Sequence, residues 1–205
     1  VCALIPPIGQ ASSAWAGFPA ASSVPAGTIR TATDYNYTEW VSDGTYWKPR
    51  GGRQRIYNIV IAFSTTGGTS EVAVWTPTIP ASMLFPGCRV FGEVQGRKTG
   101  TAGTTNPRLR YNGAGGTALA GNVAIASNQI AFMLPVNIIS GAVSAGAITL
   151  TNYFNQTIQY SGSTANAIAT ASHTIANAVT LNVTVAPSSA ADTVFMDFGY
   201  LEICG

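Results

Sequence analysis

From Ile56 onward the sequence is a series of short β-prone runs separated by turn residues, and no stretch repeats its apolar residues with a helical period. The clearest alternation lies in residues 173–185, where apolar side chains at odd positions face one way and Thr and Asn at even positions face the other. About eight strands are expected after residue 56, which is the number that a two-sheet jelly roll uses. The predicted fold class is therefore all-β, an antiparallel jelly-roll-like β-sandwich.

The expected strands differ in how clearly their patterns define a place in a sheet. Pro135 argues for an edge or a bulge in residues 128–138, because proline donates no ladder hydrogen bond. Residues 147–153 and 156–160 are expected to pair with each other across a short turn. Residues 193–204 carry large side chains on both faces, as in a central strand or a strand at a subunit interface. The other strands are expected at residues 56–63, 71–75, 89–94, 108–111 and 173–185.

The first 30 residues are rich in Ala, Ser, Pro and Gly, with isolated large side chains at Trp15 and Phe18. This composition predicts an extended arm in residues 1–30. Such an arm becomes ordered by lying on another surface, and its aromatic side chains offset the entropy cost. Trp15 and Phe18 are therefore candidate residues for anchoring the chain to a larger particle.

Residues 31–55 contain the strongest short hairpin signal of the chain, the dipeptide Asp43-Gly44. We expect a small β-meander here, with Trp40 and Trp47 close enough across the hairpin to pack together. These two tryptophans are further candidates for particle anchoring. The predicted organisation is thus an arm (1–30), an attachment module (31–55) and a jelly-roll domain (56–205).

The chain is poorly charged for its size. Charged residues make up 9% of it, against roughly 25% in an ordinary soluble domain. A subunit pressed against copies of itself can replace surface charge with contacts, so the composition favours an assembly component. The alternative is a monomer with a neutral surface rich in Ser, Thr and Asn.

All ten Lys and Arg lie between Arg30 and Arg110, whereas residues 111–205 carry only acidic charges. The basic and acidic halves could therefore meet between subunits. Three arginines near Trp47 and Tyr57 are the closest approach to a nucleic-acid signature, and they are too few to predict a nucleic-acid partner. These arginines are Arg50, Arg53 and Arg55.

No catalytic, cofactor or metal site is predicted. His173 is the sole histidine and lies among Thr and Ser, so it is expected to be a polar edge residue and not part of a Ser-His-Asp triad. Three cysteines without a C-x-x-C pair do not suggest zinc. Asp197 is expected to be buried in a structural ion pair with an arginine, and a catalytic acid in a glycan hydrolase is the lesser alternative. Residues 1–17 resemble neither a signal peptide nor a membrane anchor, and no membrane insertion is expected.

Two stretches resemble known virion proteins. Residues 24–58 resemble a short module of phage tail and virion structural proteins, which begins with PAGT (here 25–28), turns at an aspartate (Asp34) and closes with a hairpin containing DG, W and P (here SDGTYWKP, 42–49). The segments IPASMLFPGCRV, RKTGTAGTTNPRLRYNGAGGT and DTVFMDFGYLEI look like parts of the jelly-roll domain of phage tail-fibre and head-fibre proteins. The chain departs from that pattern at Asn106-Pro107, where such domains often place a lysine.

The resemblance implies a non-enzymatic surface protein of a bacteriophage, a homotrimer that contacts other virion proteins. A tail-fibre or receptor-binding role is the first reading, and a capsid decoration (head-fibre) protein is the alternative. Either would be assembled in the host cytoplasm and located in the virion.

The loop around residues 97–108 is rich in Thr between cationic ends, so it could bind a host surface polysaccharide, with an ordinary surface loop as the alternative. The candidate ligand or subunit contacts are Arg97, Lys98, Asn106, Arg108 and Arg110.

Overall fold

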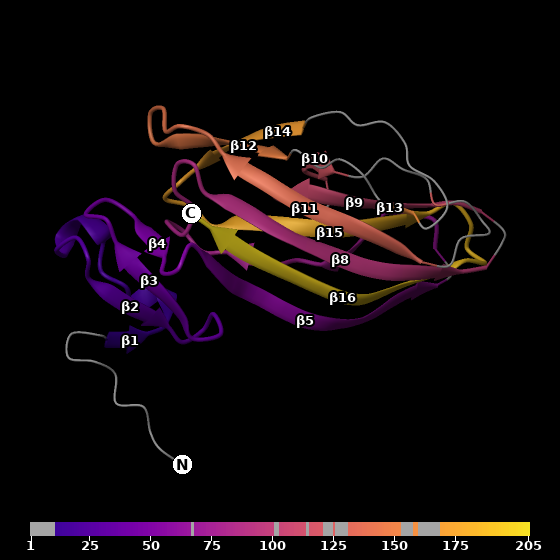
Figure 1. Cartoon of the computed structure of the whole chain (residues 1–205). Helices are drawn as coiled ribbons and strands as arrows, with labels where there is room; N and C mark the ends of the chain where they lie inside the picture. The colour runs from indigo at the N-terminus through magenta and orange to yellow at the C-terminus, as the bar shows by residue number, and fades with distance from the viewer. Residues whose placement is uncertain are drawn as a thin grey trace, which may run out of the picture.

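The computed structural model shows a β-sandwich with a small four-stranded sheet at one end, near the C-terminus (Figure 1). It describes residues 11–66, 68–100, 103–113, 115–120, 125, 131–152, 158–159 and 169–205. The small sheet contains β1 (Ala11–Ser13), β2 (Ile29–Ala32), β3 (Thr38–Ser42) and β4 (Trp47–Pro49).

The sandwich consists of a seven-stranded and a five-stranded sheet. The larger sheet has the order β14-β12-β11-β8-β16-β5, with β13 also paired to β11; the smaller has the order β10-β9-β15-β6, with β7 also paired to β15. The larger sheet contains β5 (Arg53–Thr66), β8 (Arg89–Thr99), β11 (Phe132–Ser140), β12 (Ala147–Asn152), β13 (Ile158–Gln159), β14 (Ala169–Thr174) and β16 (Thr193–Cys204). The smaller contains β6 (Val72–Trp75), β7 (Thr78–Ile79), β9 (Thr105–Tyr111), β10 (Thr117–Ala120) and β15 (Val179–Pro187).

The connectivity is that of a jelly roll. Along the chain, strands of the larger sheet (β5, β8, β11 and β16) alternate with strands of the smaller sheet (β6, the β9–β10 pair, and β15). Within each sheet these strands are antiparallel, as in a jelly roll. The strands β12, β13 and β14 are inserted between β11 and β15 and widen the larger sheet. The predicted all-β sandwich is confirmed.

The core lies between the two sheets, where alternate residues of each strand meet. Val90 and Val94 of β8 are buried there, as is Leu181 of β15. Gly92 is also on this inner face, and a Cβ at this position would collide with the carbonyl oxygen of Tyr200 on the neighbouring strand. The inward positions of the central strands are therefore closely packed.

Two expected strand arrangements are wrong. Residues 173–185 do not form one strand: β14 ends at Thr174, a turn follows with Asn177 N donating to Thr174 O at 2.9 Å, and β15 begins in the other sheet. An alternating pattern that resumes after a short turn looks continuous in the sequence. In addition, β12 pairs with β11 and β14, whereas β13 pairs with β11, so the described residues of the two segments, 147–152 and 158–159, are not partners.

The strand containing Pro135 lies inside the larger sheet. Pro135 is opposite Glu93 of β8. On the other side of β11, β13 pairs with residues 132–133 and β12 with residues 138–140, so Pro135 falls between these two pairings. This position tolerates a residue without an N–H group. Residues 128–130, the first part of the strand expected at 128–138, lie outside the described residues.

Candidate functional site

Over β5, β8 and β16, the solvent-facing side of the larger sheet carries arginine and aromatic side chains. Alternation along β8 turns Arg89, Phe91 and Arg97 outward, while Val90 and Val94 face the core. Neighbouring β5 and β16 extend the same surface, which we call the arginine–aromatic face. Its members are Arg53, Arg55, Arg89, Phe91, Arg97, Phe195, Tyr200 and Glu202.

Each arginine of this face is stacked on a ring. The guanidinium carbon of Arg97 lies 4.0 Å from the ring centre of Phe195, and that of Arg55 lies 4.5 Å from that of Tyr200. Arg53 and Arg89 share the ring of Phe91, at 5.1 and 5.4 Å. Such cation–π contacts are worth about 0.5–1 kcal/mol at exposed sites and restrict the orientation of the charged group.

One buried carboxylate organises part of the face. Glu202 is 5% exposed and accepts hydrogen bonds from Nε of both Arg53 and Arg55, the latter at 2.9 Å. The bond to Glu202 raises the pKa of Arg53. Arg97 is paired separately with Asp197 at 3.2 Å, so the expected ion pair with an arginine is present, but the Asp197 side chain is 47% exposed and the expected burial is wrong.

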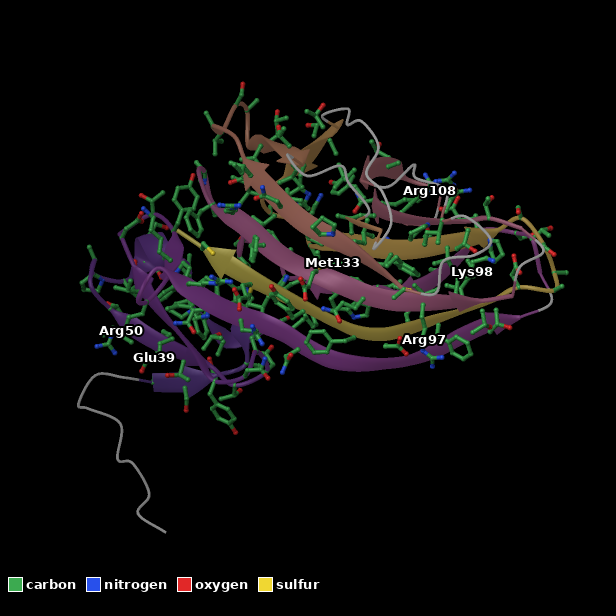
Figure 2. The ribbon with its side chains drawn as sticks, turned by 45° about the vertical axis from the view of Figure 1, so that its right-hand side comes forward. Glu39, Arg50, Arg97, Lys98, Arg108 and Met133 are labelled. Atoms are coloured by element: carbon green, nitrogen blue, oxygen red, sulfur yellow. The ribbon has the colours of Figure 1, made fainter. Side chains whose placement is uncertain are left out.

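The five residues predicted to contact a ligand or subunit do not form one surface, because β8 and β9 belong to different sheets; Figure 2 labels Arg97, Lys98 and Arg108. Arg97 belongs to the arginine–aromatic face, whereas Asn106, Arg108 and Arg110 alternate along β9 with buried residues, in the opposite sheet. Lys98 points between the sheets, is fully buried and pairs with Asp192 at 3.0 Å. It is not available to a partner in this structure.

Arg108 and Arg110 are engaged by a carboxylate of their own chain. Both donate to Glu71, which also accepts from Thr184 Oγ1. The bond from Arg110 is the largest cause that lowers the pKa of Glu71, which falls to about 2. This cluster therefore ties β9 to β15 and to the residue preceding β6.

The four predicted anchoring residues form one internal cluster. The ring centre of Trp15 lies 4.8 Å from those of both Phe18 and Trp40, and the ring centre of Phe18 lies 5.1 Å from that of Trp47. Trp40 and Trp47 are not opposite each other in the hairpin, because Trp40 pairs with Pro49 and Trp47 pairs with Ser42. They are linked instead through the rings of Trp15 and Phe18. The described part of the expected arm is folded onto the small sheet.

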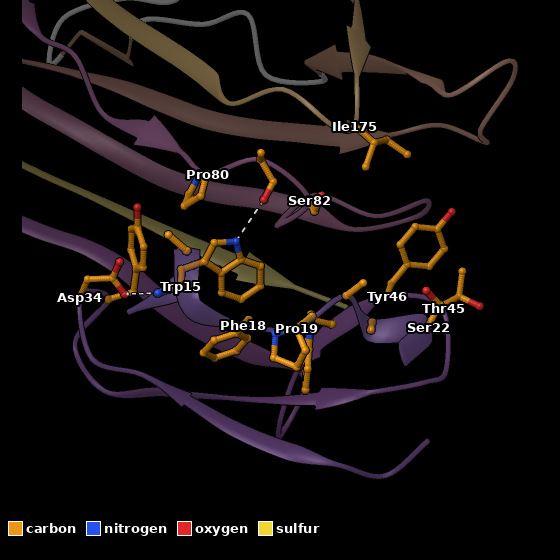
Figure 3. A pocket seen from close by; sticks show the side chains of 16 residues that line it. Trp15, Phe18, Pro19, Ser22, Asp34, Thr45, Tyr46, Pro80, Ser82 and Ile175 are labelled. Atoms are coloured by element: carbon orange, nitrogen blue, oxygen red, sulfur yellow. Dashed lines mark hydrogen bonds between the residues drawn. The ribbon is translucent and has the colours of Figure 1, made fainter. Parts of the chain in front are cut away.

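A hydrogen bond and a cleft mark the junction of the small sheet with the sandwich. Trp15 Nε1 donates to the carbonyl oxygen of Ala81 at 3.0 Å, and Asp34 accepts from Trp15 N at 2.9 Å. Beside this bond lies a cleft of about 500 Å³. Its lining includes Phe18, Tyr46, Trp47, Pro80 and Ile175 (Figure 3).

The only histidine has a structural environment. His173 is 3% exposed, and its Nδ1 lies 2.8 Å from the hydroxyl of Tyr111. Burial lowers the pKa of His173. This bond links β14 to β9 in the opposite sheet, so His173 lies in an edge strand but is buried there.

Within the described part of the chain, no three His, Cys, Asp or Glu side chains are grouped so that they could hold a metal ion. In that same part, no helix is long and apolar enough to cross a membrane.

No family model matches the chain, and no curated protein matches it. Among solved structures, it is similar to infectious bursal disease virus VP2 from a subviral particle, with 14% identity over 74% of this chain and a TM-score of 0.32. Structures of the Gx and Gt strains of that virus show 16% and 18% identity, with TM-scores of 0.32 and 0.30. The chain covers 31–32% of those proteins. A likeness at this level does not establish a common function.

The Glu202 arrangement was not predicted from the sequence. The alternation of Arg89, Phe91, Glu93, Gln95 and Arg97 was a usable signal for a polar outer face. The pairing of β8 with β16, and of β16 with β5, brings together residues that are about 150 positions apart, such as Arg53 and Glu202. That proximity cannot be read from local patterns.

Proposed function

We propose that this chain is a non-enzymatic structural protein of a bacteriophage particle. We further propose that it forms a homotrimer of the tail-fibre or receptor-binding type and is attached through its N-terminal region. The observation that carries the proposal is that the two resembling stretches coincide with the two folded parts. PAGT directly precedes β2 of the small sheet and SDGTYWKP spans the β3–β4 hairpin, while the jelly-roll segments supply both ends of β8, all of β9 and nearly all of β16.

The engagement of the acidic side chains supports a role without catalysis. All eight Asp and Glu side chains have a partner within the chain, and a glycan hydrolase needs two that act on a substrate. The partners are Trp15 N for Asp34, Arg50 for Glu39, Lys48 for Asp43, Arg108 and Arg110 for Glu71, Gln95 for Glu93, Lys98 for Asp192, Arg97 for Asp197, and Arg53 and Arg55 for Glu202.

Immunogold labelling of purified particles with an antibody to this chain tests the location. Label at the tail supports the proposal. Label on the head would replace it with capsid decoration, and particles without label would overturn the virion role. Sedimentation equilibrium of the purified chain tests the trimer, which a monomer at micromolar concentration would refute.

One observation favours the capsid decoration alternative. The small sheet is bonded directly to the sandwich through Trp15 and Ala81, and only residues 50–52 separate β4 from β5. The jelly roll is therefore close to the small sheet, the proposed attachment module. A compact attachment near the particle surface fits this arrangement better than an extended fibre does.

We also propose that host polysaccharide contacts the segment 97–108, which contains the end of β8 and the start of β9. Residues 101–102 lie outside the described residues, and Thr104 N donates to Ser188 Oγ at 2.7 Å. Binding of purified host surface polysaccharide should weaken in Asn106→Ala if the loop takes part. Unchanged binding in this variant and in Thr104→Ala would remove the loop from the proposal.

A further inference from the structure

Two guanidinium groups, those of Arg53 and Arg55, pair with the single carboxylate of Glu202 at one end of the arginine–aromatic face, and Arg89 lies on the neighbouring strand at the same end. Cys204 of β16 pairs with Arg53 of β5 on one side and with Arg89 of β8 on the other. Two residues earlier in β16, Glu202 pairs with Arg55 and with Phe91. The next carboxylate on this face, Glu93, accepts a bond from Gln95 Nε2 at 2.7 Å. The three arginines are exposed, whereas Glu202 is buried. This end of the face therefore presents surplus positive charge.

Each of the three arginine side chains is fixed by a hydrogen bond from its Nε atom. Arg53 and Arg55 donate to Glu202 through Nε, and Arg89 donates to Asn137 Oδ1 through Nε. Among the described residues, these bonds use Nε and leave the terminal Nη groups for another partner. Stacking on Phe91 and Tyr200 fixes the guanidinium planes further. Preorganised guanidinium forks are suited to bidentate binding of carboxylates.

We propose that this arginine cluster, Arg53, Arg55 and Arg89, docks an acidic segment of another virion protein. The inference rests on the proposed virion role and names the chemistry of one attachment partner. A second copy of this chain fits poorly, because each of its eight carboxylates already has a partner within the chain. A protein fits better than a glycan, because the surface is a sheet face whose Arg, Tyr and Phe residues are typical of protein interfaces.

Fluorescence anisotropy with a labelled decaglutamate peptide and the purified full chain tests the site. We expect Arg89→Gln to weaken binding about 5–10-fold, and Arg53→Gln with Arg89→Gln about 30-fold or more, because each removes a charge-assisted contact. Arg89 is the cleaner single change because its partner Asn137 is neutral. Binding should also weaken as salt rises, since exposed charges are screened.

Arg97→Gln is the matched control. Arg97 lies on the same face and is stacked on Phe195, but its charge is balanced one to one by Asp197. Combined with Asp197→Asn, so that no unpaired carboxylate is left on the face, this change should alter peptide affinity less than about twofold, because the net charge of the face stays the same. Thermal melts followed by circular dichroism confirm that each variant is folded.

Three results would overturn the proposal: no binding of the peptide, an equal loss in the control that combines Arg97→Gln with Asp197→Asn, or tighter binding of polyglucuronate or inorganic phosphate than of decaglutamate. The peptide titration uses the isolated chain, so it does not depend on the location of the protein. Unlabelled particles together with a positive titration would refute the virion role and leave an acidic-peptide site. Labelled particles with a negative titration would refute only the docking site.

Discussion

Lys98 and Asp192 form an ion pair that is excluded from solvent, with Nζ 3.0 Å from Oδ2 and both side chains 0% exposed. Lys98 Nζ also donates to the carbonyl oxygen of Gly100 at 2.9 Å. The pair joins the end of β8 to the residue preceding β16. The basic part of the sequence was expected to meet the acidic C-terminal half between subunits, but here the two meet inside one chain. Three more arginines, Arg53, Arg55 and Arg97, pair with side-chain carboxylates of the C-terminal half.

Replacement of Lys98 by Met should destabilise the fold strongly. The substitution leaves the Asp192 carboxylate buried without its cation, which costs about 3–5 kcal/mol in typical buried pairs. The double variant Lys98→Met with Asp192→Asn should lose clearly less than the single variant, because no charge is then left alone. Urea unfolding followed by circular dichroism measures both. Equal losses in the single and double variants would show that the pair is not the cause.

Glu71 should make the stability depend on acid pH. Its pKa is about 2 in the folded chain against 4.5 for the unperturbed group, so the folded state favours the ionised form. The resulting stabilisation is complete above pH 4.5 and is lost as the pH falls toward 2, and it amounts to roughly 2–3 kcal/mol after allowance for partial exposure. Glu71→Gln should therefore be less stable than the natural chain at pH 7. The difference should shrink steadily as the pH is lowered below 4.5.

Alternation within single strands was readable from the sequence. In β8, Val90 and Val94 face inward and Arg89 and Arg97 outward, as a period of two requires. The longer pattern in residues 173–185 misled because two strands in different sheets share the same alternation across a turn. The local pattern defines the faces of a strand, whereas neighbours in a sheet are set by the packing of the whole chain.

The candidate site was less predictable than the fold. Lys98 was expected to be a surface contact because buried lysines are rare, and its partner lies 94 positions away. Trp15 was expected to anchor an arm on another molecule, yet its ring is buried between Phe18 and Trp40 of the same chain. Both cases depend on long-range contacts that short motifs do not encode.

His173 should remain neutral in the folded chain at pH values where a free histidine is charged. Burial lowers its pKa below 6.5, so as the pH falls through 6.5 the unfolded chain binds a proton before the folded chain does. Stability should therefore decrease below pH 6.5 and level off above it. Because the chain has one histidine, a single imidazole NMR signal reports the titration. A midpoint at or above 6.5, or the same pH dependence in His173→Gln, would contradict this account.

Trp15 should couple the stability of the small sheet to that of the sandwich. Trp15→Phe keeps a ring in the cluster but removes the Nε1 bond to Ala81, and it should cost about 1 kcal/mol. Trp15→Ala also empties the space between Phe18 and Trp40 and should cost about 3–5 kcal/mol. Tyr37→Ala is the control, because that side chain is 72% exposed and its loss should change stability by less than about 0.5 kcal/mol. If the small sheet unfolds separately from the sandwich, limited proteolysis of Trp15→Ala will release an intact fragment beginning near Arg53, whereas a single cooperative unit will be degraded as a whole.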